Sequence, residues 1–234
     1  LHEISYRACF KPQLPRFFIQ LLTSPSAQTV VYDPFSGRGT TALEAAMLGC
    51  TPWACDINPL SRLLSLPRLH PPTIDAVADR LEQIFSSAQA GRINAHLRKG
   101  LPEDFREDLL VFYHPSTLEE IGSLRAYLRE REVAQATDDA DRWIQMVATN
   151  RLTGHSSGFF SVYSMPPNQA VSIKSQQRIN ERRNQIPPQR DVAGIILKKS
   201  RTLLAKLSEE QRLILREASQ SATLLTTSAD ATHT

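Results

Sequence analysis

Val30-Val31-Tyr32-Asp33-Pro34-Phe35-Ser36-Gly37-Arg38-Gly39-Thr40-Thr41 is the stretch that decides the fold of this chain. An apolar run ends in an acid, a turn with two glycines follows, and a segment rich in Ala, Leu and Glu comes directly after it. The pattern predicts a buried strand at 29–32 and a helix at 40–48. Glycines between a strand and a helix allow a tight turn and close approach of the backbone to a ligand. The stretch therefore predicts a site for a nucleotide-like ligand.

A second strand is expected at 51–55, after Gly49 ends the predicted helix. The order strand, helix, strand predicts two parallel strands joined by a right-handed crossover. Apolar and β-branched residues at 223–227 predict a third strand that returns to the same sheet. These elements predict an α/β fold of the Rossmann-like type, with an incomplete sheet and a large helical insertion between its second and third strands.

The chain is expected to divide into three segments. Residues 1–66 form the β-α-β core, residues 67–218 form the helical insertion, and residues 219–234 contain the strand that returns to the core. Apolar residues recur at helical spacing in several further segments. Helices are expected at 14–22, 74–88, 118–136, 141–150, 173–184, 192–206 and 208–218, and a long loop is expected at 154–169.

The composition is that of a globular protein without a membrane partner. No apolar run approaches the roughly 18 residues that a membrane span needs, and the first residues have no secretory signal pattern. Cys9, Cys50 and Cys55 lack metal-ligand spacing, so we expect reduced, buried thiols in a cytoplasmic protein and no metal site. The chain begins without Met and stops without a closing element, so we expect a fragment of a longer protein.

The acid of the opening stretch selects the ligand. The sequence at 37–42 fits G-x-G-x-x-A, and Asp56 follows Asp33 by 23 residues, so a dinucleotide oxidoreductase is one interpretation. Asp33 ends its strand at the edge where ligands bind, and its carboxylate would repel a pyrophosphate but attract a cationic amino group. The lysine of a phosphate-binding P-loop is also missing. These features favour S-adenosylmethionine (AdoMet) over NAD or ATP, although an Asp before Pro can also simply shape a turn.

The sequence resembles the amino DNA methyltransferases, which methylate the exocyclic amine of cytosine or adenine. The stretch from Asp33 to Thr41 resembles their motif I, and Ala54-Cys55-Asp56-Ile57-Asn58-Pro59 resembles their motif II. Phe10-Lys11-Pro12 and the helix after it resemble motif X, which closes over the methionine end of the cofactor. Ser228-Ala229-Asp230-Ala231 resembles motif III. The resemblance covers residues 1–66 and, less clearly, 220–234.

The resemblance implies a cofactor site and a role for each matching residue. Asp33 and the backbone of Gly37 and Gly39 would meet the methionine part of AdoMet, and Asp56 would bind the ribose. Phe35 would shape the pocket, Ile57 would pack on the adenine, and Asp230 would bind the adenine amine. The complete set expected at the cofactor is Lys11, Pro12, Asp33, Pro34, Phe35, Gly37, Gly39, Thr40, Thr41, Asp56, Ile57, Asn58 and Asp230.

The catalytic element of this family is motif IV, an Asp, Asn or Ser followed by Pro-Pro and an aromatic residue, which holds the flipped target base. Ser164-Met165-Pro166-Pro167-Asn168 departs from that pattern, because Met intervenes and Asn stands in the aromatic position. We expect motif IV beyond Thr234, so no catalytic residue is assigned in this chain, and the chain alone is expected to be inactive. The implied reaction is direct displacement, in which the target amine attacks the methyl carbon of the sulfonium.

A basic segment at 171–216 carries eleven lysines and arginines. Such a segment suits a phosphate-facing surface, although a solvated helix face explains it almost as well. Aromatic residues beside arginines are also what base stacking and phosphate contact require, although they can equally pin a loop to the core. His155 is expected to make a hydrogen bond within its loop. The candidates for DNA contact are Arg151, His155, Phe159, Arg178, Arg182 and Arg183.

Together these features predict an AdoMet-dependent DNA methyltransferase that acts on an exocyclic amine, with this chain as its cofactor-binding part. The helical insertion is the candidate region for DNA contact or target recognition. Two alternatives remain open, namely a methyltransferase that acts on RNA and a non-catalytic nucleic-acid-binding module with a vestigial AdoMet fold. The sequence does not indicate the target base, the recognition sequence or the oligomeric state.

Overall fold

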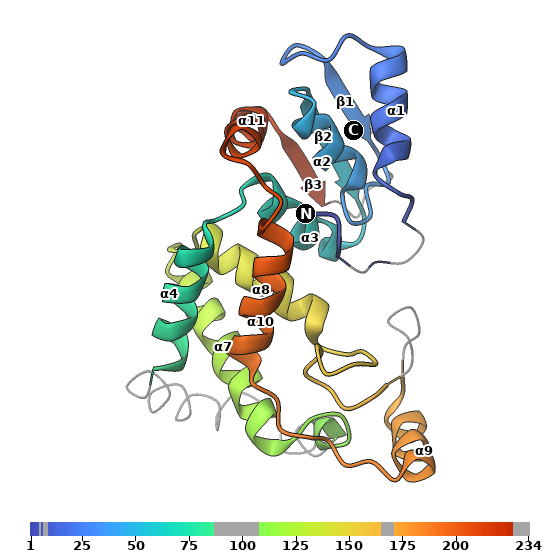
Figure 1. The fold of residues 1–234 in the computed structure, drawn as a ribbon, viewed down its shortest axis with the longest axis vertical. Helices are drawn as coiled ribbons and strands as arrows, with labels where there is room; N and C mark the ends of the chain where they lie inside the picture. The colour runs from blue at the N-terminus through green and yellow to red at the C-terminus, as the bar shows by residue number, and fades with distance from the viewer. Residues whose placement is uncertain (5, 7–8, 87–107, 165–170, 227–234) are drawn as a thin grey trace. The chain divides into compact units, whose positions relative to one another are not determined.

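The computed structural model of this protein describes residues 1–4, 6, 9–86, 108–164 and 171–226. The chain forms two compact units. The first consists of Leu1–Pro72 together with the residues from Thr202 onward, and the second is Thr73–Arg201. Among the described residues, the first unit contains strands and helices, whereas every regular element of the second is helical (Figure 1).

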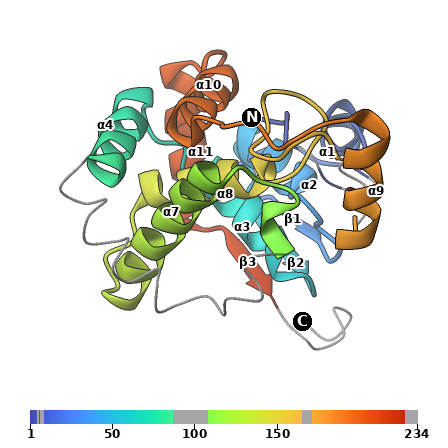
Figure 2. The same ribbon diagram turned by 90° about the horizontal axis from the view of Figure 1, so that it is seen from below.

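Within the described ranges, the first unit is built on a parallel sheet of three strands (Figure 1 and Figure 2). They are β1 (Val30–Asp33), β2 (Thr51–Asp56) and β3 (Thr223–Thr226), in the order β1-β2-β3. The register pairs Asp33 with Ala54 and Asp56 with Thr226. The prediction of an α/β chain with two parallel strands and a third that returns to them is confirmed.

The helices described for the first unit are α1 (Gln13–Leu22), α2 (Thr40–Met47), α3 (Pro59–Leu69) and α11 (Glu209–Gln220). Leu43 of α2, Leu69 of α3 and Leu215 of α11 form one apolar cluster, and Leu224 of β3 packs against it. Ile19 of α1 joins a second cluster, beside β1. Because alternate residues of a strand point to opposite faces, these contacts put the helices on one face of the sheet.

The opposite face of the sheet carries exposed apolar side chains. Tyr32 and Trp53 are partners in the register, and Leu225 lies on the same face of β3. They are 43%, 45% and 43% exposed, respectively. Cys55, the partner of Leu225 in the register, lies on the same face and is buried, so among the described residues this face is only partly open, whereas parallel sheets normally have both faces covered.

Helix α3 was not predicted. Asn58 caps its start by accepting a hydrogen bond from the backbone N–H of Leu60 at 3.0 Å, and Pro59 occupies the first helical position, where a missing N–H costs nothing. Pro67 lies inside the helix. A proline in the sequence normally indicates that a helix has ended, because it removes one backbone hydrogen bond of the helix. The cap at residues 58–59 was the available signal.

The second unit contains α4 (Ile74–Phe85), α7 (Pro115–Val133), α8 (Asp139–Arg151), α9 (Ile173–Arg183) and α10 (Val192–Leu204), whose last turn belongs to the first unit. The predicted helices are confirmed with shifted ends. Trp143 is fully buried, and its indole N–H donates to the hydroxyl of Ser200 at 3.0 Å. This bond links α8 to α10 inside the core.

The structural division differs from the predicted one. The sequence suggested that an insertion covers residues 67–218, whereas the second compact unit is Thr73–Arg201. The difference arises from α11, because Leu215 and Ala218 bury their side chains against α2 of the first unit. Its amphipathic pattern shows that α11 packs on something, but not on which unit.

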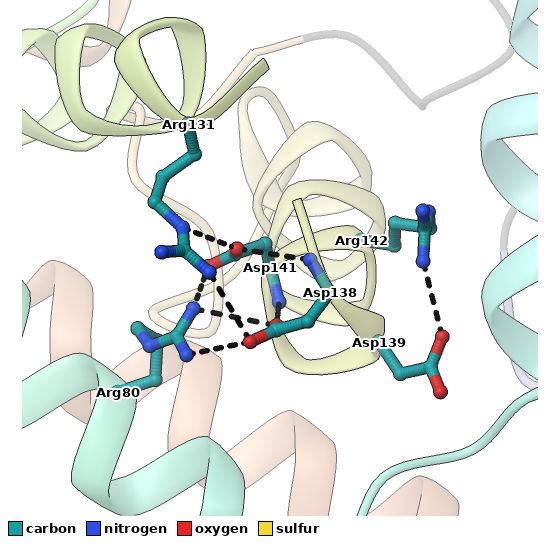
Figure 3. A network of polar contacts seen from close by, with 6 residues as sticks. All are labelled: Arg80, Arg131, Asp138, Asp139, Asp141 and Arg142. Atoms are coloured by element: carbon teal, nitrogen blue, oxygen red, sulfur yellow. Dashed lines mark hydrogen bonds and ion pairs between the residues drawn. The ribbon is translucent and has the colours of Figure 1, made fainter. Parts of the chain in front are cut away.

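An ion network joins α4, α7 and the start of α8 (Figure 3). Asp141 is fully buried and accepts hydrogen bonds from Arg80 and from Nε of Arg131, the latter at 2.9 Å. Asp138 accepts from Nη2 of Arg80 at 2.7 Å. Asp138 and Asp141 also form the capping box of α8, so the same two carboxylates start the helix and bind both arginines.

The cysteine prediction is correct for two of three residues. Cys50 and Cys55 are buried and Cys9 is exposed, and all three are free thiols. Cys50 belongs to the cluster beside α1, whereas Cys9 lies in the segment before α1, where its thiol donates to the carbonyl of Tyr6 at 3.4 Å.

Candidate functional site

Two carboxylates lie at the carboxyl ends of neighbouring parallel strands. Asp33 is the last residue of β1, and Asp56 is the last residue of β2. Both side chains remain partly exposed. In open α/β sheets this edge is where ligands bind, so the two predicted acids lie at the position that a ligand site requires.

The loop after β1 adopts a conformation that needs its glycines. Gly37 and Gly39 have φ values of +51° and +72°, in the left-handed region that L side chains rarely adopt. A Cβ added at Gly39, the N-cap of α2, would lie 2.7 Å from Cβ of Ser65 on α3. Helix α3 therefore packs directly against the glycine loop and leaves no room for a side chain.

Asp56 joins the end of β2 to the glycine loop. One carboxylate oxygen accepts from the backbone N–H of Gly37 at 2.7 Å, and the other accepts from the N–H of Asn58 at 2.9 Å. The N–H of Ser36 donates to the carbonyl of Cys55 at 3.0 Å, which adds a second bond between loop and strand. A carboxylate offers about four acceptor sites, so Asp56 keeps capacity for ligand hydroxyls.

Asp33 shapes the turn and also retains a free oxygen. Its Oδ1 accepts from the N–H of Phe35 at 3.1 Å, the hydrogen bond of an Asx-turn. No bond to the other oxygen, Oδ2, occurs within the described part of the chain. Asp33 therefore shapes the turn through Oδ1, as one interpretation of the sequence predicted. Its second oxygen, Oδ2, is available to a ligand.

Two apolar side chains at the same edge are largely exposed. Phe35, two residues after β1, is 76% exposed, and Ile57, directly after β2, is 69% exposed. Exposed large apolar residues beside convergent polar groups are typical of ligand sites. The structure therefore brings together the predicted pocket residue, the predicted adenine contact and both acids.

The N-terminal segment is held against the loop by Arg38. The Arg38 guanidinium donates to the carbonyl oxygens of His2, Ile4 and Phe10 at 3.1, 2.7 and 3.4 Å. The phenol oxygen of Tyr6 accepts from Nδ2 of Asn58 at 3.4 Å. Sequence reasoning missed Arg38 and Tyr6, because single side chains that join distant backbone segments leave no local pattern.

The remaining residues predicted to contact the cofactor differ in how exposed they are. Thr40 is buried, and its hydroxyl accepts from Nε of Arg38 at 3.0 Å, so it serves the fold of the loop. Pro34 and Thr41 are partly exposed, Lys11 is exposed, and Pro12 precedes α1. Asp230 lies outside the described residues, as do the residues after Ser164 in the Pro-Pro run.

The residues predicted for DNA contact lie in two groups of the second unit. Phe159 is only 6% exposed, and the guanidinium of Arg151 stacks on its ring at 4.2 Å from the centroid. A buried ring covered by an arginine is not free to stack on a base. His155 is exposed beside it, with its ring centroid 6.0 Å from that of Phe159.

The second group lies on α9. Arg178, Arg182 and Arg183 are all exposed there, and the guanidinium of Arg183 stacks on the ring of Tyr163 at 3.4 Å from the centroid. Burial lowers the pKa of Arg151, whereas the α9 arginines face solvent. The α9 group therefore presents more accessible charge than the group at Arg151.

A separate apolar cavity of about 390 Å³ lies along α7 and α8. Leu124, Leu128, Ala148 and Phe160 line it, with Arg129 among the polar residues at its rim. None of the residues predicted for cofactor or DNA lines this cavity. Its chemistry therefore adds nothing to the candidate site.

Two classes of site or segment were not found in the described ranges. No group of His, Cys, Asp and Glu side chains could hold a metal ion there. None of the helices in that part of the chain has the length and apolar content to cross a membrane.

Comparison with known proteins gives one partial similarity. Over 67 residues, 28% of its length, the chain is 37% identical to the Type II methyltransferase M.MvaI of Kocuria varians. The matched stretch covers 15% of the length of that relative. No protein-family model matches the chain, and no solved structure matches it. The chain is thus similar in part to a methyltransferase, in agreement with the α/β sheet and the ligand edge described above.

Proposed function

We propose that the carboxyl ends of β1 and β2 bind AdoMet, and that this chain is the cofactor-binding part of a methyltransferase that acts on an exocyclic amine of cytosine or adenine in DNA. The observation that carries the proposal is the arrangement at one sheet edge. Two carboxylates, a glycine loop without lysine and two exposed apolar side chains converge there. The partial similarity to a Type II methyltransferase supports the same function.

The charge of the edge favours AdoMet over a phosphate-bearing cofactor. Asp33 and Asp56 put two carboxylates at the ends of β1 and β2, and they already accept from the loop N–H groups of Phe35 and Gly37. A pyrophosphate would meet repulsion at this position. The α-ammonium and the ribose hydroxyls of AdoMet would find acceptors there instead.

The residues of the edge suggest how the cofactor is held. The free oxygen of Asp33 would accept from the ammonium, and the glycine loop would approach the methionine part closely. Asp56 would accept from the ribose hydroxyls, and Ile57 and Phe35 would cover the adenine and the pocket wall. The role of Asp230 at the adenine amine stays part of the proposal. When bound, the cofactor supplies an electrophilic methyl group on a sulfonium.

Equilibrium dialysis with labelled AdoMet tests the assignment of the two acids. Asp33→Asn and Asp56→Asn keep the side-chain shape and remove one charge each. We expect each to weaken binding at least tenfold, which corresponds to roughly 1.4 kcal/mol or more. Asp75→Asn is the matched control, because Asp75 lies in the first turn of α4 in the second unit. Unchanged affinity in both edge variants would remove the basis of the proposal.

Methyl transfer to DNA is a separate part of the proposal. The expected substrate is duplex DNA, and structured RNA is the comparison. Incubation of the full-length parent protein with labelled AdoMet and each nucleic acid measures which one accepts the methyl group. Label in RNA alone would contradict the DNA assignment and leave the cofactor site untouched.

A further inference from the structure

The outer face of α9 carries a regular row of cations. Lys174, Arg178 and Arg182 follow one another at intervals of four residues, so they lie on one face of the helix, about 6 Å apart along its axis. All three are exposed. Within the described residues none of the three forms an ion pair with a carboxylate, whereas Arg80, Arg131, Arg142 and Arg212 do.

The inner face of α9 is fixed by side-chain amides. Nε2 of Gln176, a fully buried residue, donates to the carbonyl of Tyr163 at 2.8 Å and to Oδ1 of Asn180 at 2.8 Å. Nδ2 of Asn180 donates to the carbonyl of Val111 at 2.9 Å. Nε2 of Gln185 donates to the same carbonyl of Tyr163 at 3.0 Å. These bonds tie α9 and the residue Gln185 after it to two backbone carbonyls, those of Tyr163 and Val111, so the outer cations stand on an anchored helix.

A planar cation adjoins this row. The guanidinium of Arg183 stacks on the ring of Tyr163, and Arg183 itself is exposed. Stacking fixes the guanidinium plane, and guanidinium planes are surfaces on which unpaired bases and phosphates bind. The α9 basic face, defined as Lys174, Arg178, Arg182 and Arg183, therefore combines a row of exposed cations with one guanidinium that is stacked on an aromatic ring.

We infer that the α9 basic face binds the phosphate backbone of nucleic acid and is the element of the second unit that holds the substrate. The inference rests on the proposed function, since it names a surface for the substrate of that enzyme. Cations that pair with no carboxylate of the described residues fit a polyanion, because none of the salt bridges described above has to break on binding. The anchored helix also loses little freedom when it binds. Backbone contacts of this kind position a duplex without reading its sequence.

The salt dependence of binding tests this inference. The double variant Arg178→Gln/Arg182→Gln removes two charges from the row and leaves the buried anchors in place. A short fluorescent DNA duplex is titrated with the unaltered chain and with the variant over a series of NaCl concentrations. Each phosphate contact contributes roughly 0.9 to the slope of log K against log salt, so we expect the slope to fall by about 2.

The chain offers a matched control on another helix. Arg125 and Arg129 of α7 are also exposed and also four residues apart, so Arg125→Gln/Arg129→Gln changes net charge by the same amount. We expect the slope to stay within about half a unit of the unaltered value in this variant. Equal loss in both variants would overturn the inference, because net charge and not the α9 basic face would then govern binding.

Two further results would show that the α9 basic face does not bind nucleic acid. An unchanged slope in the α9 variant, or competition by polyglutamate as strong as by unlabelled DNA at equal charge concentration, would overturn the inference. AdoMet dialysis on the same variants keeps this failure separate from failure of the proposed function. A chain that binds AdoMet normally but shows no α9-dependent DNA binding retains its cofactor site and loses only this surface.

Discussion

At the residue scale, Asp56 has a structural and a proposed binding role at once. It links the end of β2 to the glycine loop through the N–H of Gly37 and to the start of α3 through the N–H of Asn58. A carboxylate fixed by two backbone donors has a defined direction, so its remaining lone pairs are pre-oriented toward a ligand. Loss of Asp56 should therefore loosen the loop as well as remove an acceptor.

The substitution Gly39→Ala should damage the site more than its backbone strain alone explains. A residue other than glycine at φ +72° costs roughly 1–2 kcal/mol, and the added Cβ would also collide with Ser65 on α3. We expect the free energy of unfolding to fall by about 2–4 kcal/mol and AdoMet binding to weaken more than tenfold. Urea denaturation and equilibrium dialysis measure the two effects.

Gly49→Ala is a control that has the backbone strain of Gly39→Ala without a steric clash of the added Cβ. Gly49 has a φ of +77°, close to that of Gly39, but no atom outside its own neighbours lies within 4 Å of an added Cβ. This control should lose roughly 1–2 kcal/mol and keep its AdoMet affinity. Equal stability losses in the two variants would show that α3 does not constrain the glycine loop.

The sequence predicted the positions of Asp33 and Asp56 because both follow apolar strands, and strand ends are readable from a local pattern. It did not predict the bond between Asp56 and Gly37, since that contact depends on the register of two strands. The contacts of Arg38 with His2 and Ile4 were missed because they join residues 36 and 34 positions apart in the chain, which leaves no local pattern. Local patterns locate side chains, whereas long-range hydrogen bonds require the three-dimensional fold.

At the scale of elements, the start of α8 holds α4 and α7 through the buried carboxylate of Asp141 and the more exposed one of Asp138 (Figure 3). Asp141→Asn should lower the free energy of unfolding by about 3–5 kcal/mol, because it leaves Arg80 and Arg131 without their buried partner. The fluorescence of Trp143, a fully buried residue of α8, reports this transition in a variant with Trp53→Phe.

Asp139, two residues before Asp141 on α8, provides the matched comparison. Its carboxylate pairs with Arg142 at 3.2 Å, and both side chains are substantially exposed. Asp139→Asn should cost no more than about 1 kcal/mol, since water competes for exposed pairs. If both substitutions cost the same, burial would not be what gives the network its strength.

Element prediction succeeded where amphipathic patterns were long and failed at α3. Helices α4, α7 and α8 were predicted from the sequence. Helix α3 was not, because its residues Pro59 and Pro67 are typical of non-helical segments. The first proline is compatible with a helix start and the second lies near the end, where few hydrogen bonds depend on it. Helix α3 matters to the site, because Ser65 closes the space behind Gly39.

At the scale of the whole molecule, a carboxylate paired with His2 and Arg16 makes the stability of the first unit depend on pH. Burial alone would raise the pKa of Glu44, but hydrogen bonds from His2 and Arg16 outweigh it and lower that pKa below its ordinary 4.5. A carboxylate with a lowered pKa stabilises the fold above its ordinary pKa, and this contribution is lost as the pH falls through the folded value. The first unit should therefore lose stability below about pH 4.5.

The substitution Glu44→Gln tests this dependence. It should lower the stability of the first unit by about 1–3 kcal/mol at neutral pH and flatten the loss of stability between neutral pH and pH 3. Trp53 lies on β2 and reports on the first unit in a variant with Trp143→Phe. An acid transition of Trp53 that is unchanged in Glu44→Gln would contradict the role assigned to Glu44.

The division of the chain was only partly readable from the sequence. The β-α-β core and the returning strand were predicted from local pattern, but the assignment of α11 to the first unit depends on which surface Leu215 meets. The exposure of Tyr32 and Trp53 on one face of the sheet could likewise not be predicted from the sequence. Packing partners are properties of the whole molecule, and amphipathic periodicity shows only that a partner exists.

Calorimetric titration with AdoMet tests the central claim most directly, with NADH titrated under the same conditions. The account predicts saturable one-to-one binding of AdoMet and no heat of binding for NADH. It rests on the two carboxylates at the ends of β1 and β2, which repel a pyrophosphate and accept from an ammonium and a ribose. Binding of NADH with no binding of AdoMet would contradict it.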